Sequence, residues 1–248
     1  MIAGACRTAA VVAMVLATLA CSVTAKAQTS ARSCPVRLAG AKRLVLVTAK
    51  GMNDTVATLR LYQRGSASEP WQARGEAEPA VLGTKGMAWS RFFKGLVRPG
   101  EPIKVDGDKR APAGVFPIGR SFGTLASTRP NYLRVTPDTI CVDDSASPAY
   151  NTIASRSRLG PLVHAENMSR VSLYRRGLLV DYPTDARSKA GSCIFIHIWR
   201  SPTIGTGGCV AVPEPRVEAL QDFAADGAVL AILPRTALDR LAGCIPEK

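Results

Sequence analysis

The chain has 248 residues, of which 46% are hydrophobic, so it can bury the core of one domain or of two small ones. Its formal charge of +13 at pH 7 either indicates an anionic partner, such as an acidic polymer or acidic lipid, or serves only solubility. No tight run of Lys and Arg is interleaved with aromatic residues, so we expect no nucleic-acid partner.

The first residues have the layout of a secretory signal peptide. Arg7 precedes an apolar run over residues 8–20, and an Ala-Lys-Ala sequence stands before Gln28. The run is too short to span a bilayer comfortably. We therefore predict residues 1–27 as a cleaved signal and an exported, periplasmic protein that does not span the membrane. A lipoprotein alternative places Cys21 at the new N-terminus, but the residue three positions before it is Thr rather than Leu.

Segments of β-rich or alternating composition recur along the rest of the chain, separated by Gly and Pro turns. The predicted strands are Lys42–Lys50, Thr55–Arg64, Pro70–Gly83, Val115–Ile118, Tyr132–Val135, Thr139–Val142, Ser172–Asp181, Ser192–Trp199, Cys209–Val212 and Ala228–Leu233. Many short strands with few long periodic segments predict a mainly β fold, a sandwich or a barrel of mixed sheets.

Helices are predicted only near the C-terminus. Residues 214–227 place apolar side chains, beginning with Val217, on one face and end at Gly227. Residues 234–243 repeat this scheme on a smaller scale. No internal repeat or low-complexity linker divides the mature chain, so we predict residues 28–248 as a single catalytic domain with a few short helices.

The cysteines predict two disulfides and one free thiol. Seven cysteines occur, and two of them precede residue 28. The remaining five are an odd number, which in an oxidising compartment leaves one thiol unpaired as a candidate nucleophile. Four paired cysteines allow three connectivities. The ends of a folded chain often lie close together, so we favour Cys34–Cys244 and, by exclusion, Cys141–Cys193.

The stretch GSCIFIHIWRSPTIGTGGCVAVP carries one of the two histidines in the chain and then the remaining cysteine. Side chains alternate along a strand, so the isoleucines turn to the core, and His197 shares the opposite face with Cys193, Phe195 and Trp199. The Gly/Pro loop then reverses the chain. We expect this reversal to return Cys209 to the side of His197.

This pairing predicts thiol chemistry, because a thiol needs a neighbouring base to ionise at neutral pH and imidazole is well suited to that task. Gly207 and Gly208 remove side-chain bulk, so that backbone N–H groups can approach a substrate oxygen. The alternatives are a hydrogen-bonded core histidine and a Gly-Gly-Cys turn that feeds a disulfide. A metal site through Cys193, His197 and Cys209 lacks close ligand pairs and a fourth ligand, so we expect no metal or cofactor.

From LVLVTAKGMNDTVATLRLYQRG through APAGVFPIG to HIWRSPTIGTGGCVAVP, the chain resembles the L,D-transpeptidase catalytic domain, the YkuD-like family of bacterial cell-wall enzymes. The motifs CVDD and GSCIFIHIW are similar to those of its proteobacterial branch, and the resemblance covers nearly the whole mature chain. It implies the β fold of that family, with Cys209 as nucleophile, His197 as its base and the Ile198 carbonyl orienting the imidazole ring. Backbone N–H groups near Gly208 and Cys209 would then hold the oxyanion.

The resemblance also implies the substrates, which are donor and acceptor stem peptides of peptidoglycan, with a wall-anchored lipoprotein as a further acceptor. Arg200 is either a partner for a stem-peptide carboxylate or a solvated loop residue. Trp199 either walls the cleft or packs in the core. Thr206, which opens the Thr-Gly-Gly-Cys motif, is a further candidate for substrate binding, and Glu166 is a candidate partner for the ammonium group of a diamino acid.

Some positions depart from the family pattern. Gly207 stands where many members have a second His, and Ala211 stands where they have Arg. These departures leave the Cys/His pair intact and leave open which cross-link is made. The other histidine, His164, is interpreted as a surface or loop residue, and Asp143-Asp144 as a turn.

Two other functions compete with transpeptidation. Water would capture the same thioester in an L,D-carboxypeptidase or amidase that undoes cross-links, because these enzymes share the acyl-enzyme. A non-catalytic wall-binding module is the alternative of a different class. An intact Cys/His pair with one unpaired cysteine argues against that module.

Overall fold

The computed structural model describes Met1 and residues 34–246. The chain divides into two units, Met1–Arg32 and Ser33–Lys248, and the fold is that of the second unit. Beyond Met1, the predicted signal over residues 1–27, its cleavage point and the alternative lipidated cysteine lie outside the described residues.

Strands make up most of the regular structure of residues 34–246. The strands are β1 (Arg43–Ala49), β2 (Val56–Gln63), β3 (Gln72–Val81), β4 (Met87–Trp89), β5 (Ala111–Gly123), β6 (Leu133–Arg134), β7 (Thr139–Val142), β8 (Ile153–Ser155), β9 (Ala165–Asn167), β10 (Gly177–Val180), β11 (Phe195–Ile198), β12 (Val210–Val212) and β13 (Ala228–Pro234). The helices are α1 (Val36–Ala39), α2 (Arg156–Leu159), α3 (Glu214–Phe223) and the 3-10 helices η1 (Arg91–Leu96), η2 (Met168–Arg170), η3 (Ser172–Arg175) and η4 (Arg235–Leu241). The prediction of a mainly β fold with a few short helices is confirmed.

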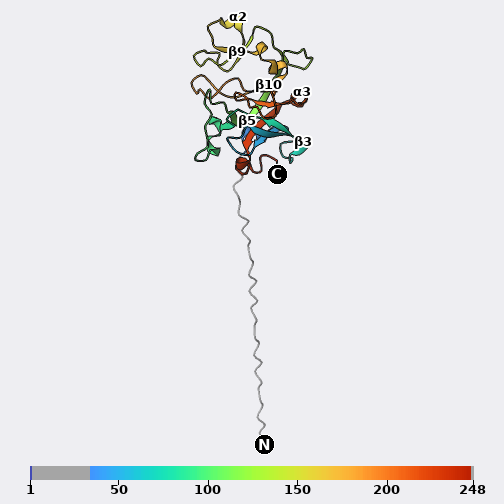
Figure 1. The fold of residues 1–248 in the computed structure, drawn as a ribbon. Coiled ribbons are helices and arrows are strands. Elements are labelled where there is room, and N and C mark those ends of the chain that lie inside the picture. Colours follow the sequence, from blue (N-terminus) through green and yellow to red (C-terminus); the bar gives the residue numbers. More distant parts are fainter. Residues whose placement is uncertain (2–33, 247–248) are drawn as a thin grey trace. The chain divides into compact units, whose positions relative to one another are not determined.

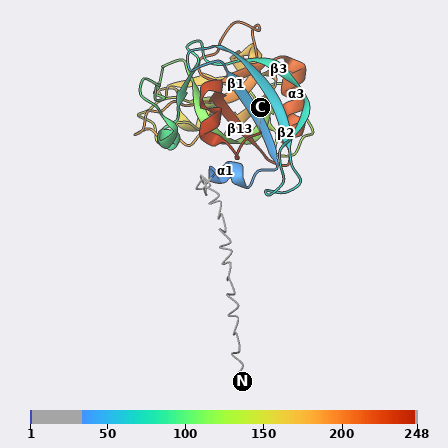
Figure 2. The same ribbon diagram turned by 90° about the horizontal axis from the view of Figure 1, so that it is seen from below.

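Within the described part of the chain, eight strands close into a barrel in the order β10, β11, β12, β3, β2, β1, β13 and β5. The ring closes because β5 also pairs with β10, where Gly177 lies opposite Phe122 and Val180 opposite Ile118. The sheet is mixed, since β1 pairs antiparallel with β2 and parallel with β13. Figure 2 shows this side of the barrel, with β1, β2, β3 and β13 labelled.

The burial of each strand follows its sequence pattern. The apolar strand β13 lies between β1 and β5 and is buried at every position. The alternating strand β2 buries Ala57, Leu59 and Leu61, while the side chains between them are partly exposed. The strands predicted at β1, β2 and β7 agree with the structure to within one residue at each end. The helix predicted from residue 214 is α3, which buries Val217 and Leu220.

One prediction of element type is wrong. The strand predicted over residues 172–181 is η3 followed by β10, because the turn packs Tyr174 edge-on against Phe122, with ring centroids 5.7 Å apart. Strand β10 begins at Gly177, directly opposite Phe122 of β5. A Cβ atom on residue 177 would lie 2.3 Å from the Phe122 ring. The helix predicted over residues 234–243 is the 3-10 helix η4 rather than an α-helix.

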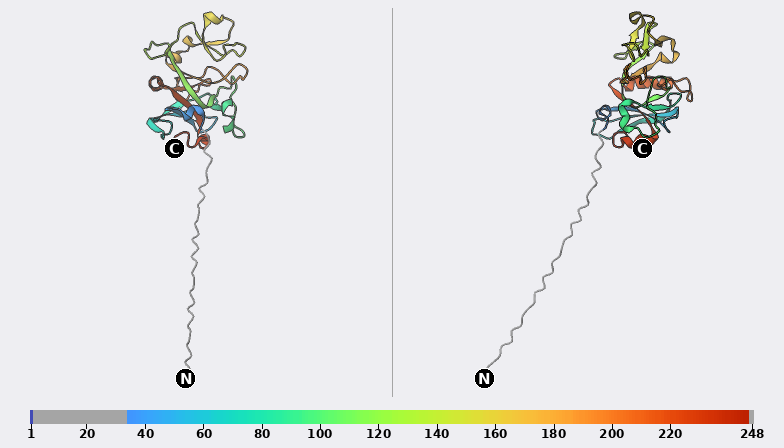
Figure 3. Two further views of the ribbon diagram at one scale, coloured as in Figure 1. Left: turned by 180° about the vertical axis from the view of Figure 1, so that it is seen from behind. Right: turned by 90° about the vertical axis from the view of Figure 1, so that its left-hand side faces the viewer.

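Strands β7, β8 and β9 form a separate antiparallel sheet, which we call the small sheet. Figures 1 and 3 show this yellow part of the chain at one end of the barrel, where the long strand β5 leads toward it. The Cys141–Cys193 disulfide ties β7 to the segment that enters β11. A hydrophobic cluster with members from both parts, including Met168 and Phe195, packs the small sheet against the barrel.

Both predicted disulfides are present, Cys34–Cys244 and Cys141–Cys193. Among residues 34–246, Cys209 is the free cysteine, and it is buried. Two disulfides fit an oxidising, exported compartment. None of the helices in the described ranges is long and apolar enough to cross a membrane.

Removing the Cys34–Cys244 disulfide is expected to destabilise the fold. The two residues are 210 positions apart, and a cross-link over so long a segment strongly restricts the unfolded chain. A Cys34→Ser/Cys244→Ser variant should lose about 2–5 kcal/mol of unfolding free energy, measured by urea denaturation under oxidising conditions. Equal stability of this variant and the wild type would contradict the expectation.

Candidate active site

Cys209 opens into a cavity of about 440 Å³ between the barrel and the small sheet. The cavity is lined by Lys104, Asp106 and Gly107 from the loop before β5, by Asp143, His164 and Glu166 from the small sheet and its loops, by Tyr174 from η3, by Gly191, Ser192, Cys193, Ile194 and His197 from the β11 region, and by Gly207, Gly208 and Cys209 from the loop before β12. The predicted nucleophile, the predicted base and the acidic candidate Glu166 therefore share one cavity.

The loop before β12 holds Cys209 through the side chain of Thr206. Thr206 Oγ1 donates a hydrogen bond to the Cys209 carbonyl oxygen at 2.7 Å and accepts one from the Gly208 N–H at 3.1 Å. Gly208 has a φ of +148°, and a Cβ there would lie 3.0 Å from the Arg110 carbonyl oxygen, so this close approach requires glycine. Thr206 does not line the cavity, and it contacts the loop rather than the space that a substrate would fill.

The Gly208 N–H is not the free oxyanion donor that the resemblance implied, because it donates to Thr206 Oγ1. The backbone donor that faces the thiol is instead the Phe195 N–H, 3.3 Å from Cys209 Sγ. The sulfur in turn donates to the Cys193 carbonyl oxygen at 3.5 Å. The sequence pattern missed Phe195 because a backbone N–H that donates from strand β11 to a side chain leaves no residue-type signal.

Cys209 is protonated at rest. Burial raises the pKa of the Cys209 thiol to about 12, although the hydrogen bond from the Phe195 N–H lowers it in part. The Glu166 carboxylate also raises this pKa, whereas Lys104 lowers it. A nucleophile in this environment needs a base that removes its proton as the reaction proceeds.

His197 is the candidate base that lines this cavity from the barrel. Its Nδ1 atom lies 2.7 Å from the Ile198 carbonyl oxygen, so Nδ1 carries the proton and Nε2 is the acceptor in the neutral imidazole. The Tyr174 ring packs edge-on against the imidazole, with centroids 5.4 Å apart. Burial lowers the pKa of His197 to about 4, and the Ile198 hydrogen bond opposes this shift.

The thiol and the imidazole are neutral neighbours rather than an ion pair. Parallel pairing of β11 with β12 sets His197 opposite Ala211, two residues after Cys209. No hydrogen bond joins Cys209 Sγ to His197 within residues 34–246, because the sulfur is bonded to the Phe195 and Cys193 backbone groups. Proton transfer therefore requires the Cys209 side chain to move toward the imidazole or a water to bridge them.

Besides Thr206, two further predicted substrate contacts lie outside the cavity. Trp199 is half-buried after β11, and Arg200 is exposed on the loop that follows. Neither residue lines the cavity around Cys209. The alternation argument places Trp199 on the same strand face as His197, but the strand ends at Ile198 and the chain turns away. The solvated interpretation of Arg200 fits the structure better, whereas Trp199 belongs neither to the cavity lining nor to the two hydrophobic clusters of the described residues.

Glu166 occupies the small-sheet wall of the cavity. It lies on β9, and the Tyr174 hydroxyl donates to its Oε2 atom at 2.9 Å. Burial raises the pKa of the Glu166 carboxyl, while the Tyr174 hydrogen bond lowers it. Tyr174 thus links this carboxylate to the imidazole of His197 by touching both, and the sequence did not single it out.

Asp143 and His164, interpreted from the sequence as turn and loop residues, both line the cavity. The predicted turn fits Asp144, whose Oδ1 atom accepts a hydrogen bond from the Ala146 N–H at 2.8 Å. Asp143 differs, because its Oδ1 atom lies 2.5 Å from Nδ1 of His164. The sequence separates these two residues, so their pairing carried no local signal.

The loop before β5 supplies a buried charge that sequence reasoning missed. Lys104 is 3% exposed, and its Nζ atom donates to Asp108 Oδ1 at 2.6 Å and to the Val105 carbonyl oxygen at 2.8 Å. Asp106 accepts hydrogen bonds from the Tyr150 hydroxyl at 2.8 and 2.7 Å, which joins this loop to the small sheet's β7–β8 connection. One Lys and two Asp residues within five positions are the local sequence signal of this cluster.

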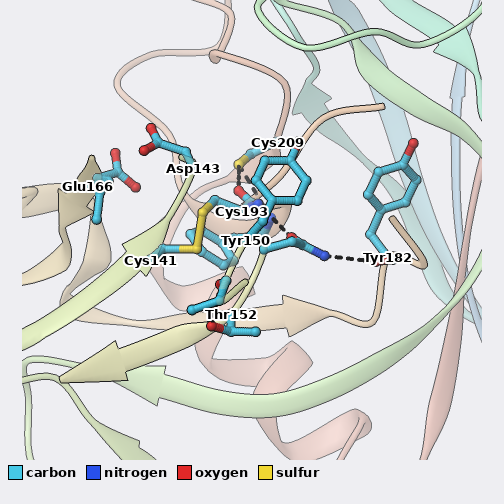
Figure 4. The surroundings of a disulfide bond; sticks show 12 residues. Cys141, Asp143, Tyr150, Thr152, Glu166, Tyr182, Cys193 and Cys209 are labelled. Atoms are coloured by element: carbon cyan, nitrogen blue, oxygen red, sulfur yellow. Dashed lines mark hydrogen bonds between the residues drawn. A yellow bond between two sulfur atoms is a disulfide. The ribbon is translucent and has the colours of Figure 1, made fainter. Parts of the chain in front are cut away.

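The Cys141–Cys193 disulfide forms part of the wall that separates this cavity from a second one of about 360 Å³. Figure 4 shows the disulfide next to the Cys209 sulfur and Tyr182 farther from it. Asn151 accepts a hydrogen bond from the Cys193 N–H at 2.9 Å and donates one to the Tyr182 carbonyl oxygen at 3.0 Å. The disulfide and the two hydrogen bonds of Asn151 therefore fix the backbone at Cys193, whose carbonyl oxygen accepts the hydrogen bond from the Cys209 thiol.

The buried His197 predicts a specific dependence of stability on pH. Its pKa of about 4 is below the ordinary value of about 6.5, so as the pH falls through this window the unfolded chain binds a proton that the folded chain does not. The stability contributed above pH ~6.5 is then lost as the pH falls toward about 4, by roughly 3 kcal/mol. Urea unfolding of the wild type and of His197→Gln at pH 7 and pH 4.5 measures the difference. Equal losses in the two proteins would contradict the neutral, buried imidazole.

No protein-family model matches this chain, and a comparison with curated proteins finds no significant match. The similarity to L,D-transpeptidases therefore stays a prediction that rests on the motifs in the sequence. Across residues 34–246, no three His, Cys, Asp or Glu side chains come together as a metal site.

Proposed function

We propose that this chain is a periplasmic cysteine L,D-transpeptidase that forms peptidoglycan stem-peptide cross-links through a thioester on Cys209. The observation that carries the proposal is a buried cysteine, free among the described cysteines, in a cavity that His197 also lines. The Ile198 carbonyl leaves the other ring nitrogen of His197 as an acceptor. The sequence motifs around both residues resemble that family.

In the acylation step, Cys209 Sγ attacks a peptide carbonyl of the donor stem. A C–S bond forms and the C–N bond breaks, while His197 Nε2 takes the thiol proton and delivers it to the departing amine. Burial keeps both groups neutral at rest, with a pKa of about 12 for Cys209 and about 4 for His197. The proton is therefore transferred as the carbonyl reacts, and the free protein does not store a thiolate.

The oxyanion needs a backbone donor close to the sulfur. The Phe195 N–H already points at Cys209 Sγ and loses its partner when the thiol moves to attack. We assign the oxyanion contact to this group, because the Gly208 N–H is held by Thr206. In the second step an acceptor amine attacks the thioester, and the amide forms as the sulfur leaves.

Two features support a wall polymer as the substrate. Without Arg7 and Lys26 of the predicted signal, the formal charge of +13 becomes +11, which favours association with anionic polymers at the surface of the wall. The cavity is flanked by carboxylates at Asp106, Asp143 and Glu166, which suit the ammonium group of a diamino acid in a stem peptide.

Incubation of the purified protein with purified muropeptides tests this function. We expect cross-linked dimers by liquid chromatography with mass detection, and a covalent adduct on Cys209 after treatment with a carbapenem, whose strained amide mimics the donor carbonyl. Trimmed stems without dimers would assign the hydrolytic alternative. An adduct without any change in the muropeptides would leave the thiol chemistry standing and refute the substrate.

A further inference from the structure

Both histidines of the chain line the cavity around Cys209. His197 enters from strand β11 of the barrel, whereas His164 enters from the loop before β9 of the small sheet. Acylation, as described above, employs only the histidine on β11. The second imidazole therefore lines the same cavity as Cys209 without a role in the first half of the reaction.

His164 is oriented by a carboxylate. Its Nδ1 atom lies 2.5 Å from Asp143 Oδ1, so Nδ1 holds the proton and Nε2 is left as an acceptor in the neutral ring. The His164 backbone N–H also faces Asp144 Oδ2 at 3.4 Å. The side chain is 81% exposed, so a proton taken up at Nε2 can pass directly to water. This arrangement has the parts of a general base: an imidazole, an orienting carboxylate and solvent access.

We propose that His164, oriented by Asp143, is the acid–base catalyst of the second half-reaction and removes a proton from the acceptor amine that attacks the thioester on Cys209. This inference rests on the proposed function and adds to it a residue for acceptor activation. Asp143 acts as a positioning residue, because it touches His164 and stabilises the imidazolium that forms.

The proton balance of the second step calls for this group. An acceptor that arrives as an ammonium ion loses two protons when it becomes an amide: one leaves before the nitrogen attacks, and the other as the C–N bond forms. When the C–S bond breaks, the sulfur takes up only one proton, which His197 can carry because it gave its own to the first leaving amine. The other proton goes to His164 Nε2 and then to water.

The negative charges that line the cavity increase the need for a base that deprotonates the acceptor. The carboxylates of Asp106, Asp143 and Glu166 line it, whereas the lining lysine, Lys104, is already paired with Asp108. Figure 4 shows Asp143 and Glu166 on the same side of the disulfide. The negative electrostatic potential of these carboxylates attracts an ammonium ion. It also stabilises the protonated form of the amine, which cannot attack a carbonyl.

The test separates the two half-reactions with small acceptors of different basicity. A His164→Gln variant is compared with the wild type and with Leu162→Gln, a matched control on the same loop whose side chain is 96% exposed. Acyl-enzyme formation on Cys209 from a donor muropeptide is followed by intact mass, and its transfer to glycinamide or hydroxylamine by product analysis. Glycinamide needs deprotonation at neutral pH, whereas hydroxylamine is mostly uncharged there.

We expect His164→Gln to form the acyl-enzyme at the wild-type rate and to transfer it to glycinamide about a hundred-fold more slowly, at the lower end of general-base effects. Transfer to hydroxylamine should be nearly unchanged. A merely structural role of His164 would not produce this difference between the two acceptors. Asp143→Asn should show the same difference in weaker form, and Leu162→Gln should match the wild type.

Two outcomes would overturn the inference in distinguishable ways. If His164→Gln forms the acyl-enzyme and transfers it to both acceptors as the wild type does, or loses both acceptors equally, His164 is not the acceptor base although the proposed function stands. If the wild type forms no acyl-enzyme at all, the proposed function fails, and the inference fails with it.

Discussion

Replacing Cys209 by serine is expected to abolish both carbapenem adduct formation and muropeptide turnover, with at least a ~10³-fold loss. The site is built around a sulfur: the Phe195 N–H donates to it and the Cys193 carbonyl accepts from it. Burial already raises the pKa of this thiol to about 12, and a hydroxyl is far harder to ionise beside the same imidazole. The measurements are intact mass after carbapenem treatment and product analysis with muropeptides.

The Cys34→Ser/Cys244→Ser variant is the matched control, because it also exchanges sulfur for oxygen but lies outside the cavity around Cys209. It should retain the adduct and the turnover at temperatures where it is folded. Wild-type turnover in Cys209→Ser would end the thiol mechanism, whatever the behaviour of the control.

Replacing His197 by glutamine is expected to slow acylation of Cys209 by about 10²- to 10⁴-fold at neutral pH, the usual range for loss of a general base. The imidazole is neutral at this pH because burial lowers its pKa to about 4, so it can accept the thiol proton. The deficit should shrink as the pH rises, since the thiolate fraction of an unassisted thiol increases about tenfold per unit below its pKa of about 12.

Acylation rates measured from pH 7 to pH 10 test this expectation. Leu162→Gln is the control, because Leu162 is 96% exposed and does not line the cavity, so its replacement should leave acylation unchanged. A deficit in His197→Gln that stays constant over this range would mean that His197 shapes the cavity and does not take the proton.

Much of the site's immediate framework could be predicted because it depends on local periodicity. Alternation along β11 sends Ile194 and Ile196 into the main core, and sends Phe195 into the cluster that contains Cys209. His197 follows the same face as Phe195 and meets Tyr174. The two-residue period of a strand requires no information from the rest of the chain, so the face of each side chain was evident from its position.

The mainly β class, the strands at β1, β2, β7 and β13, and the cysteine pairs could all be predicted from the chain's local patterns. Apolar runs and alternating runs select buried and half-buried strands through nearest-neighbour geometry. An odd cysteine count isolates one thiol by simple arithmetic, and the closeness of chain ends selects Cys34–Cys244. These properties are carried by composition and spacing.

Only the tertiary structure decided what faces the thiol. The closure of β5 on β10, the docking of the small sheet and the pairing of His164 with Asp143 join segments that are distant in the sequence. The Gly208 N–H donates to Thr206 Oγ1, whereas the Phe195 N–H donates to the sulfur of Cys209. Buried backbone groups form hydrogen bonds, and the fold decides which partner lies near each of them. Contacts between distant segments depend on how the whole chain packs, and a local pattern of residue types does not encode them.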